Sequence, residues 1–255
     1  GANYQAVDVQ QNESGWLTFT CKHQNHAVPF VLPVPAAHLL PSILGAIACA
    51  HQAGISLERL ARQAAHYQPL LGRCSLHSLG DGRTVICDTV KAPFSTLSLA
   101  FDLLNDFPRS RPRRIVLGNV SDYPGSWTPK IKRISEQALS VADELILHRP
   151  PAGIDRMVGR YGAERVKSFQ PVAEIPAYLQ QEGPDEDVIL LKSSGVNHLE
   201  SLLLPWLGAP ACMREPCALK NSCFSCEHGF ARGTAPSFPH YVNYCRGLVR
   251  LQRQE

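Results

Sequence analysis

The chain has 255 residues, of which 44% are hydrophobic and 18% charged, and its formal net charge is +3. This composition supports a large buried core and excludes a disordered, highly charged chain, while the small net charge gives no reason to expect a nucleic-acid partner. No apolar run approaches the roughly 20 residues of a membrane span, and the first residues lack the pattern of a signal peptide. We therefore expect a cytoplasmic protein without a membrane span.

The first part of the chain predicts a small unit of strands followed by helices. Its strands are expected at 15–21 and 26–32, and its helices at 38–53 and 56–67. Pro29 indicates an edge strand, since proline cannot donate to a neighbouring strand. Ser56 is a typical N-cap for the second helix. The pattern breaks at 68–72, where we place a hinge.

From residue 72 onward, short apolar strands alternate with helices. The strands are expected at 84–88, 114–119, 144–148, 166–169 and 187–192, and the helices at 94–106, 129–142, 152–161, 172–181 and 197–206. Continuous apolar strands between helices are typical of a parallel sheet covered on both faces. Because ligands of such sheets bind at the carboxyl ends of the strands, we expect a site around 88–93, 118–125, His148 and 192–195.

A basic run occupies residues 109–114, with prolines at 108 and 112 that exclude a helix. No aromatic residues interleave it, so it does not resemble a single-strand nucleic-acid platform. We interpret it as a solvated loop that precedes a buried strand.

Five of the nine cysteines lie in the last 44 residues of the chain. Cys212, Cys217, Cys223 and Cys226 offer four thiolates within fifteen residues, which suits a tetrahedral Zn²⁺ site or an iron–sulfur cluster. His228 or Cys245 would be able to replace one ligand. The odd total and the scattered remaining cysteines favour a reducing compartment over a disulfide framework. A closing helix is expected at 241–253.

Several segments, taken in chain order, resemble those of Mur ligases. The segments are Val34-Pro35-Ala36-Ala37-His38-Leu39-Leu40-Pro41-Ser42, Gln68-Pro69-Leu70-Leu71-Gly72-Arg73, Cys87-Asp88-Thr89-Val90-Lys91-Ala92-Pro93, Val116-Leu117-Gly118-Asn119 and Val188-Ile189-Leu190-Leu191-Lys192-Ser193-Ser194-Gly195. The first of them is followed by an Ala-rich helix and then by Gly54-Ile55-Ser56-Leu57-Glu58. The resemblance covers about residues 1–206 and is closest to the branch that adds D-alanyl-D-alanine.

The resemblance implies three parts. Residues 1–71 would be the remainder of a central ATPase domain, 72–206 a Rossmann-like C-terminal domain, and 207–255 a cysteine-rich metal-binding extension outside the family pattern. The implied activity is an ADP-forming amide ligase that uses ATP and Mg²⁺. It would join an amino acid or dipeptide to an anionic carboxylate acceptor such as a cell-wall precursor.

The resemblance also implies roles for residues at the strand ends, and no catalytic residue within this chain. Asp88 would contact the nucleotide ribose, and Arg73 and Lys91 the nucleotide phosphates or sugar. Alternatively, these three are a helix-capping acid, a hinge arginine and a surface lysine. The implied substrate-binding residues are Asn119, Ser121, Lys192, Ser193 and Ser194.

The sequence also departs from the family pattern. The P-loop pattern G-x-x-x-x-G-K-[ST] is absent from the 255 residues, and Leu39 and Ser42 stand where the family has asparagines. Without the first strands of an ATPase domain, the strands at 15–34 would keep unpaired edges and an uncovered apolar face. An N-terminal portion, a partner protein with a P-loop segment, or a degenerate non-catalytic role would each explain this. The alternatives to a ligase are therefore a pseudo-ligase that docks a partner through its metal-binding tail, or an unrelated Rossmann-like metal or redox protein.

Overall fold

The computed structural model describes residues 3–207 except 13, 36, 68, 80, 151 and 182–185, together with 212, 214, 217, 219 and 222–226. The predicted helix at 241–253, with His228 and Cys245, lies outside these residues. The chain divides into two compact units, one of residues 1–70 and 74–76 and one of residues 71–73 and 77 onward. The domain identities implied for 1–71, 72–206 and 207–255 stay predictions. Within the described residues, every helix is too short or too polar to cross a membrane.

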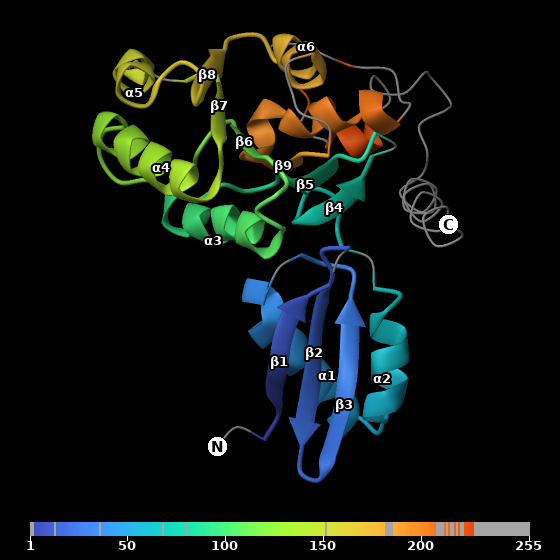
Figure 1. Cartoon of the computed structure of the whole chain (residues 1–255). Coiled ribbons are helices and arrows are strands. Elements are labelled where there is room, and N and C mark those ends of the chain that lie inside the picture. Colours follow the sequence, from blue (N-terminus) through green and yellow to red (C-terminus); the bar gives the residue numbers. More distant parts are fainter. Residues whose placement is uncertain are drawn as a thin grey trace. The chain divides into compact units, whose positions relative to one another are not determined.

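The first unit contains a three-stranded antiparallel sheet and two helices (Figure 1). The sheet order is β1 (Gln5–Gln11), β2 (Leu17–His23) and β3 (His26–Leu32), so the strand with Pro29 lies at an edge as predicted. The 3₁₀ turn η1 (Ala37–Leu39) precedes α1 (Leu40–Gln52) and α2 (Leu57–Ala64), and Ser56 caps α2 by accepting from the Arg59 N–H at 3.3 Å.

The expectation of an uncovered apolar face in this unit is wrong. Alternate residues of β2, such as Leu17 and Phe19, are buried in a core that α1 and α2 complete. The edge of β2 is paired by β1, which the sequence did not predict. β1 is polar and largely exposed, and its register shifts between Val7 and Gln10, so it lacks the alternation that marks a strand.

The second unit is built on a six-stranded sheet, which confirms the predicted α/β class with a parallel sheet. The strand order is β4 (Ser75–Ser78), β5 (Thr84–Asp88), β9 (Val188–Lys192), β6 (Arg113–Leu117), β7 (Glu144–His148) and β8 (Val166–Phe169). The five strands from β5 to β8 are parallel. Every residue of β6, β7 and β9 is buried, as expected for strands covered on both faces.

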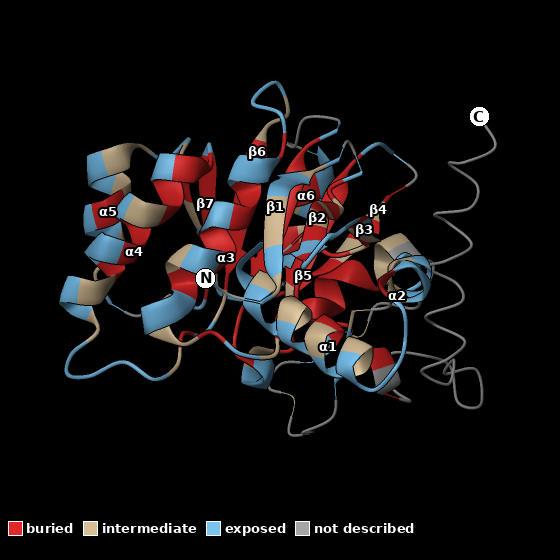
Figure 2. Ribbon diagram, turned by 90° about the horizontal axis from the view of Figure 1, so that it is seen from below, coloured by how far each residue is buried: buried red, intermediate tan, exposed pale blue. Residues whose placement is uncertain are grey.

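Helices and 3₁₀ turns connect these strands. They are η2 (Phe94–Thr96), α3 (Leu97–Asp102), η3 (Leu103–Asp106), α4 (Thr128–Val141), α5 (Ile154–Tyr161) and α6 (Glu174–Gln181). Figure 2 shows exposed residues on the outer sides of α4 and α5 and buried residues along β7. The single helix expected at 94–106 is instead three consecutive pieces.

The prediction of a helix at 197–206 is wrong. The chain forms separate 3₁₀ turns there, η4 (Gly195–Asn197), η5 (Leu199–Leu203) and η6 (Pro205–Leu207), and a further turn, η7, at Cys223–Ser225. His198 has a left-handed backbone with φ of 48°, which interrupts any helix at that point. The leucines of η5 are still fully buried, so the apolar residues that suggested a helix serve the core in a tighter coil.

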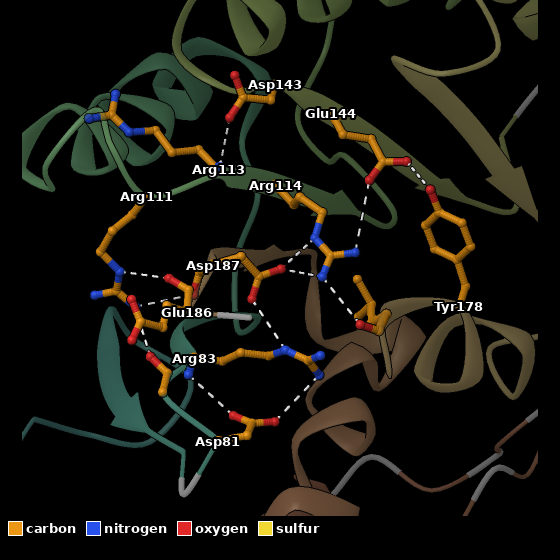
Figure 3. Close-up of polar contacts among 12 residues, drawn as sticks. Asp81, Arg83, Arg111, Arg113, Arg114, Asp143, Glu144, Tyr178, Glu186 and Asp187 are labelled. Carbon is orange, nitrogen blue, oxygen red and sulfur yellow. Dashed lines mark hydrogen bonds and ion pairs between the residues drawn. The ribbon is translucent and has the colours of Figure 1, made fainter. Parts of the chain in front are cut away.

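The interpretation of 109–114 as a solvated loop before a buried strand is confirmed for its exposed first residues, 109 and 110, but not for the arginines at its end. β6 begins at Arg113, and the side chains of Arg113 and Arg114 are almost fully buried. Arg114 Nε donates to the carboxylate of the fully buried Asp187 at 2.5 Å (Figure 3). Arg111 Nε donates to the Glu186 carbonyl at 2.6 Å. Acceptors from the two residues that precede β9 therefore bind the guanidinium groups of Arg111 and Arg114.

Candidate functional site

The carboxyl ends of three parallel strands meet at one edge of the second unit's sheet. β9 lies between β5 and β6, and its last residue, Lys192, is in register with Asp88 on one side and Leu117 on the other. The prediction that Asp88 and the 192–195 turn lie on one rim is therefore confirmed. Polar side chains that follow these strands must share this edge.

A buried ion pair joins β5 to β9 at this edge. Lys192 Nζ lies 2.5 Å from Asp88 Oδ2 and donates to the Lys91 carbonyl at 2.7 Å. Lys192 is only 4% exposed, whereas Asp88 is partly exposed. A buried ammonium needs such partners, because an unpaired charge in this position would be costly. The pair holds the Asp88 carboxylate in a fixed place at the mouth of the strand ends.

A second network joins β9 to the loop after β6. Asn119 Nδ2 donates to Ser194 Oγ at 2.8 Å, and the Ser194 N–H donates to the Asn119 carbonyl at 2.8 Å. Ser193, fully buried, accepts from the Asn119 N–H at 3.1 Å and donates to the Ser194 carbonyl at 2.9 Å. A Cβ on Gly118 would lie 2.5 Å from Ser193 Oγ, so this close approach requires glycine.

The remaining predicted residues lie around these two networks. Ser121 Oγ donates to Asp122 Oδ2 at 2.8 Å, and the Ser121 N–H donates to the Ala92 carbonyl at 2.8 Å, which ties the loops after β5 and β6 together. Lys91 and Arg73 are exposed. Sequence reasoning missed Asp122, whose left-handed φ of 55° is the kind of turn for which aspartate is suited.

Arg73 is placed near the strand-end loop by its neighbour, Gly72. The Gly72 carbonyl accepts from the N–H groups of Thr89 and Val90 at 2.9 and 3.2 Å. Gly72 has a φ of +78°, and a Cβ there would lie 3.1 Å from a Val90 methyl group. The backbone that carries the Arg73 side chain is therefore held next to the residues that follow Asp88.

The structure also brings His148, predicted at the end of a strand, next to Asn197. His148 ends β7 and is buried, and Asn197 Nδ2 lies 3.4 Å from its Nδ1. They sit at the same edge of the sheet, because β7 is parallel to β6.

The predicted cysteine ligands lie partly in the interior. Cys223 and Cys226 are buried, while Cys212 and Cys217 are half-buried. Burial raises the pKa of the Cys223 thiol, and nearby Glu200 and the other three thiols raise it further. Among the described residues, the group whose potential ligand atoms all lie within 4.8 Å of one another is His198, Glu200 and Cys223.

Sequence reasoning missed His198 and Glu200 in this cluster. They lie more than twenty positions before Cys223 and within a stretch whose apolar periodicity pointed only to a helix. The metal site formed by the four cysteines stays a prediction.

Comparison with solved structures shows what fold this arrangement belongs to. MurF from Acinetobacter baumannii matches 81% of this chain and 45% of its own, with 19% identity and a TM-score of 0.68. MurF from Thermotoga maritima in complex with ADP matches 80% of this chain and 45% of its own, with 16% identity and a TM-score of 0.64. The chain has a Mur ligase fold.

MurC from Thermotoga maritima has the same fold, with a TM-score of 0.57 and 15% identity over 76% of this chain and 43% of its own. No protein-family model and no curated protein matches the sequence. The chain spans about 45% of the length of the MurF chains that it matches. The Mur ligase resemblance seen in the sequence is thus confirmed as a likeness of fold.

Proposed function

We propose that this chain is part of an ADP-forming ligase that joins an amino acid or dipeptide to a carboxylate acceptor such as a cell-wall precursor. The observation that carries the proposal is the Asp88–Lys192 pair at the carboxyl ends of neighbouring parallel strands, within a Mur ligase fold. The similar MurF of Thermotoga maritima is a complex with ADP, which supports a nucleotide as ligand.

The residues around Asp88 fit a nucleotide. A partly exposed carboxylate fixed by Lys192 is able to accept hydrogen bonds from ribose hydroxyl groups. Lys91 and Arg73, both exposed and beside the same loop, would contribute positive charge toward the phosphates. When bound, ATP with its Mg²⁺ would supply the phosphoryl group that activates the acceptor carboxylate.

The turn after β9 fits an anionic or amide-bearing substrate. Asn119, Ser121 and Ser194 carry hydrogen-bonding groups at this edge, and Lys192 adds a cation. The hydroxyl of Ser193 already has two bonds within the protein, so its role would be to fix the turn that presents Ser194. Positioning of this kind is the main requirement when an amine attacks an activated acyl group.

The phosphate-binding loop would come from another polypeptide segment, since the 255 residues contain no P-loop pattern. The same observation favours a second candidate function, a non-catalytic pseudo-ligase that docks a partner. Its cysteine-rich tail, with zinc or an iron–sulfur cluster, would form the docking module.

Calorimetric titration of the full chain with ADP tests the nucleotide site. We expect Asp88→Asn to weaken binding at least tenfold and Lys91→Met several-fold. Asp102→Asn and Lys132→Met, which change exposed residues on α3 and α4, serve as matched controls. Equal affinity of all four variants would contradict the assigned roles.

A second assay tests catalysis by combining the chain with a P-loop-bearing segment. The ligase proposal requires ADP release that depends on both an amine and a carboxylate acceptor. If the chain binds ADP but the mixture never forms ADP from ATP, the pseudo-ligase is favoured.

A further inference from the structure

The cysteine-rich segment packs against the second unit, next to the residues that follow the 192–195 turn. η7 packs against η5, and Phe224 is buried in the core of the parallel-sheet unit, where its ring stacks against His77. The Cys223 N–H donates to Glu200 Oε1 at 3.1 Å. This attachment joins residues 222–226 to the stretch that follows the 192–195 turn.

Two buried polar atoms at this junction lack partners. His198 and Glu200 are only 8% and 3% exposed. Within the described part of the chain, His198 Nδ1 and Glu200 Oε2 have no hydrogen-bond partner. Buried polar atoms are nearly always satisfied, so two orphans that face a buried thiol indicate a missing ligand.

The hydrogen bonding of His198 fixes which of its nitrogens faces the cluster. Nε2 lies 2.9 Å from the Leu219 carbonyl, which is only able to accept, so Nε2 carries a proton. In a neutral ring, Nδ1 then presents its lone pair toward Glu200 and Cys223. A carbonyl that orients the far nitrogen is the usual arrangement for a metal-binding histidine.

The side chains of His198, Glu200 and Cys223 each offer one ligand atom within 4.8 Å of the other two, close enough to share one cation. His198 Nδ1 and Glu200 Oε1 are 3.7 Å apart, beyond the range of a good hydrogen bond. Two nitrogen or oxygen ligands of a tetrahedral Zn²⁺ are separated by roughly 3.3–3.6 Å, from metal–ligand bonds of about 2.0–2.2 Å, slightly less than the 3.7 Å observed to Oε1. Because Glu200 Oε1 accepts from the Cys223 amide, Oε2 remains available to a metal.

We propose that His198, Glu200 and Cys223 bind one zinc ion, with Cys226 as the fourth ligand. Cys226 is buried and lies one 3₁₀ turn after Cys223, with its N–H 3.3 Å from the Cys223 carbonyl. It is not in the group of three whose ligand atoms all lie within 4.8 Å of one another, so zinc binding would draw its thiol inward. A mixed set of nitrogen, oxygen and sulfur ligands suits zinc, whereas iron–sulfur clusters are held chiefly by thiolates. Cys212 and Cys217 are outside this ligand set.

The backbone at His198 supports a site that is built for this purpose. Its left-handed conformation is uncommon for a residue other than glycine and places His198 beside Glu200 rather than along a helix. Zinc would bridge residues 198–200 to the cysteine-rich segment and so hold that segment to the sheet. The inference is independent of the proposed ligase activity.

Zinc content of the purified full chain, measured by mass spectrometry after dialysis, tests the proposal. We expect one zinc ion per chain and no iron or sulfide. Competition with a chromogenic chelator should show affinity falling at least tenfold for His198→Ala, Glu200→Gln and Cys226→Ser. Cys212→Ser, Cys217→Ser and the exposed Cys49→Ser should stay within about twofold of the unmodified chain.

Glu200→Gln guards against a loss of zinc through misfolding, because its amide oxygen still accepts from the Cys223 N–H. Circular dichroism and thermal melting of the zinc-free variant should match those of the zinc-free parent. Loss of zinc in Cys212→Ser and Cys217→Ser but not in Glu200→Gln would overturn the proposal in favour of a four-thiolate site. Bound iron with sulfide, or no zinc at all, would overturn it as well.

Discussion

The buried carboxylate of Asp187 is expected to be among the most important side chains for the stability of the second unit. It is fully buried between Arg114 and Arg83, whose guanidinium groups lie within ion-pair distance (Figure 3). Burial raises the pKa of the Asp187 carboxyl, and the two arginines oppose this by lowering it. Asp187→Ala would leave the Arg114 guanidinium buried with the Leu179 carbonyl at 3.2 Å and, as its nearest remaining carboxylate, Glu144 at 4.0 Å.

Removing one partner of a buried ion pair typically costs about 3–5 kcal/mol. The matched control is Glu136→Ala, which removes two exposed ion pairs, with Lys132 at 3.9 Å and with Arg160 at 3.4 Å. That change should cost less than about 1 kcal/mol. With a urea dependence of about 1–3 kcal/mol per molar, Asp187→Ala should lower the unfolding midpoint by roughly 1–5 M.

Tryptophan fluorescence in a Trp16→Phe background follows the unfolding of the second unit, because Trp206 packs against its core. Asp187→Asn should fall between the parent and Asp187→Ala, since it keeps an acceptor but loses the charge. If Asp187→Ala and Glu136→Ala shift the midpoint equally, the buried network contributes no more than a surface pair. The structural interpretation of the arginine run would then be refuted.

Three further changes test other parts of the structure. Gly118→Ala should destabilise the second unit by about 1–3 kcal/mol through its clash with Ser193, and added Ser193→Gly should restore much of this loss in a urea titration. Burial lowers the pKa of His77 to about 4 from 6.5, so stability should fall by about 3 kcal/mol between pH 6.5 and 4. His77→Leu should lack this pH dependence. Ser56→Ala should cost the first unit about 1 kcal/mol, as followed by Trp16 fluorescence, whereas Ser56→Asp should be neutral.

The strands that were predictable from sequence are those buried on both faces. Continuous apolar runs such as 144–148 and 188–192 have few alternatives to a central parallel strand. β1 and β4 were missed because the first is polar and exposed and the second has only four residues. In both, neighbouring strands rather than local sequence determine the conformation.

The arginines of β6 show why burial of charge is hard to predict. Arg114 is more than seventy positions from Asp187, its partner in the folded protein. Local sequence shows only a basic run with prolines, which is the usual composition of a solvated loop. The compensating carboxylate becomes visible only when β9 is placed next to β6.

The candidate site was predictable to the extent that parallel topology determines it. In a parallel sheet the residues after each strand share one edge, so the grouping of Asp88, Asn119 and Lys192 followed from the alternation of strands and helices. Their individual contacts did not follow, because they depend on the strand order. β9, the last strand among the described residues, lies between β5 and β6, which come before it in the chain.

That strand order gives the 192–195 turn its importance. Since β9 is central, its carboxyl end contacts both neighbouring loops, through Lys192 to Asp88 and through Ser194 to Asn119. A residue of an edge strand would be able to fix only one of these loops. The residues proposed for the nucleotide and those proposed for the substrate are therefore held to the same short turn. Their relative positions depend on β9, which is followed directly by the stretch that carries His198 and Glu200.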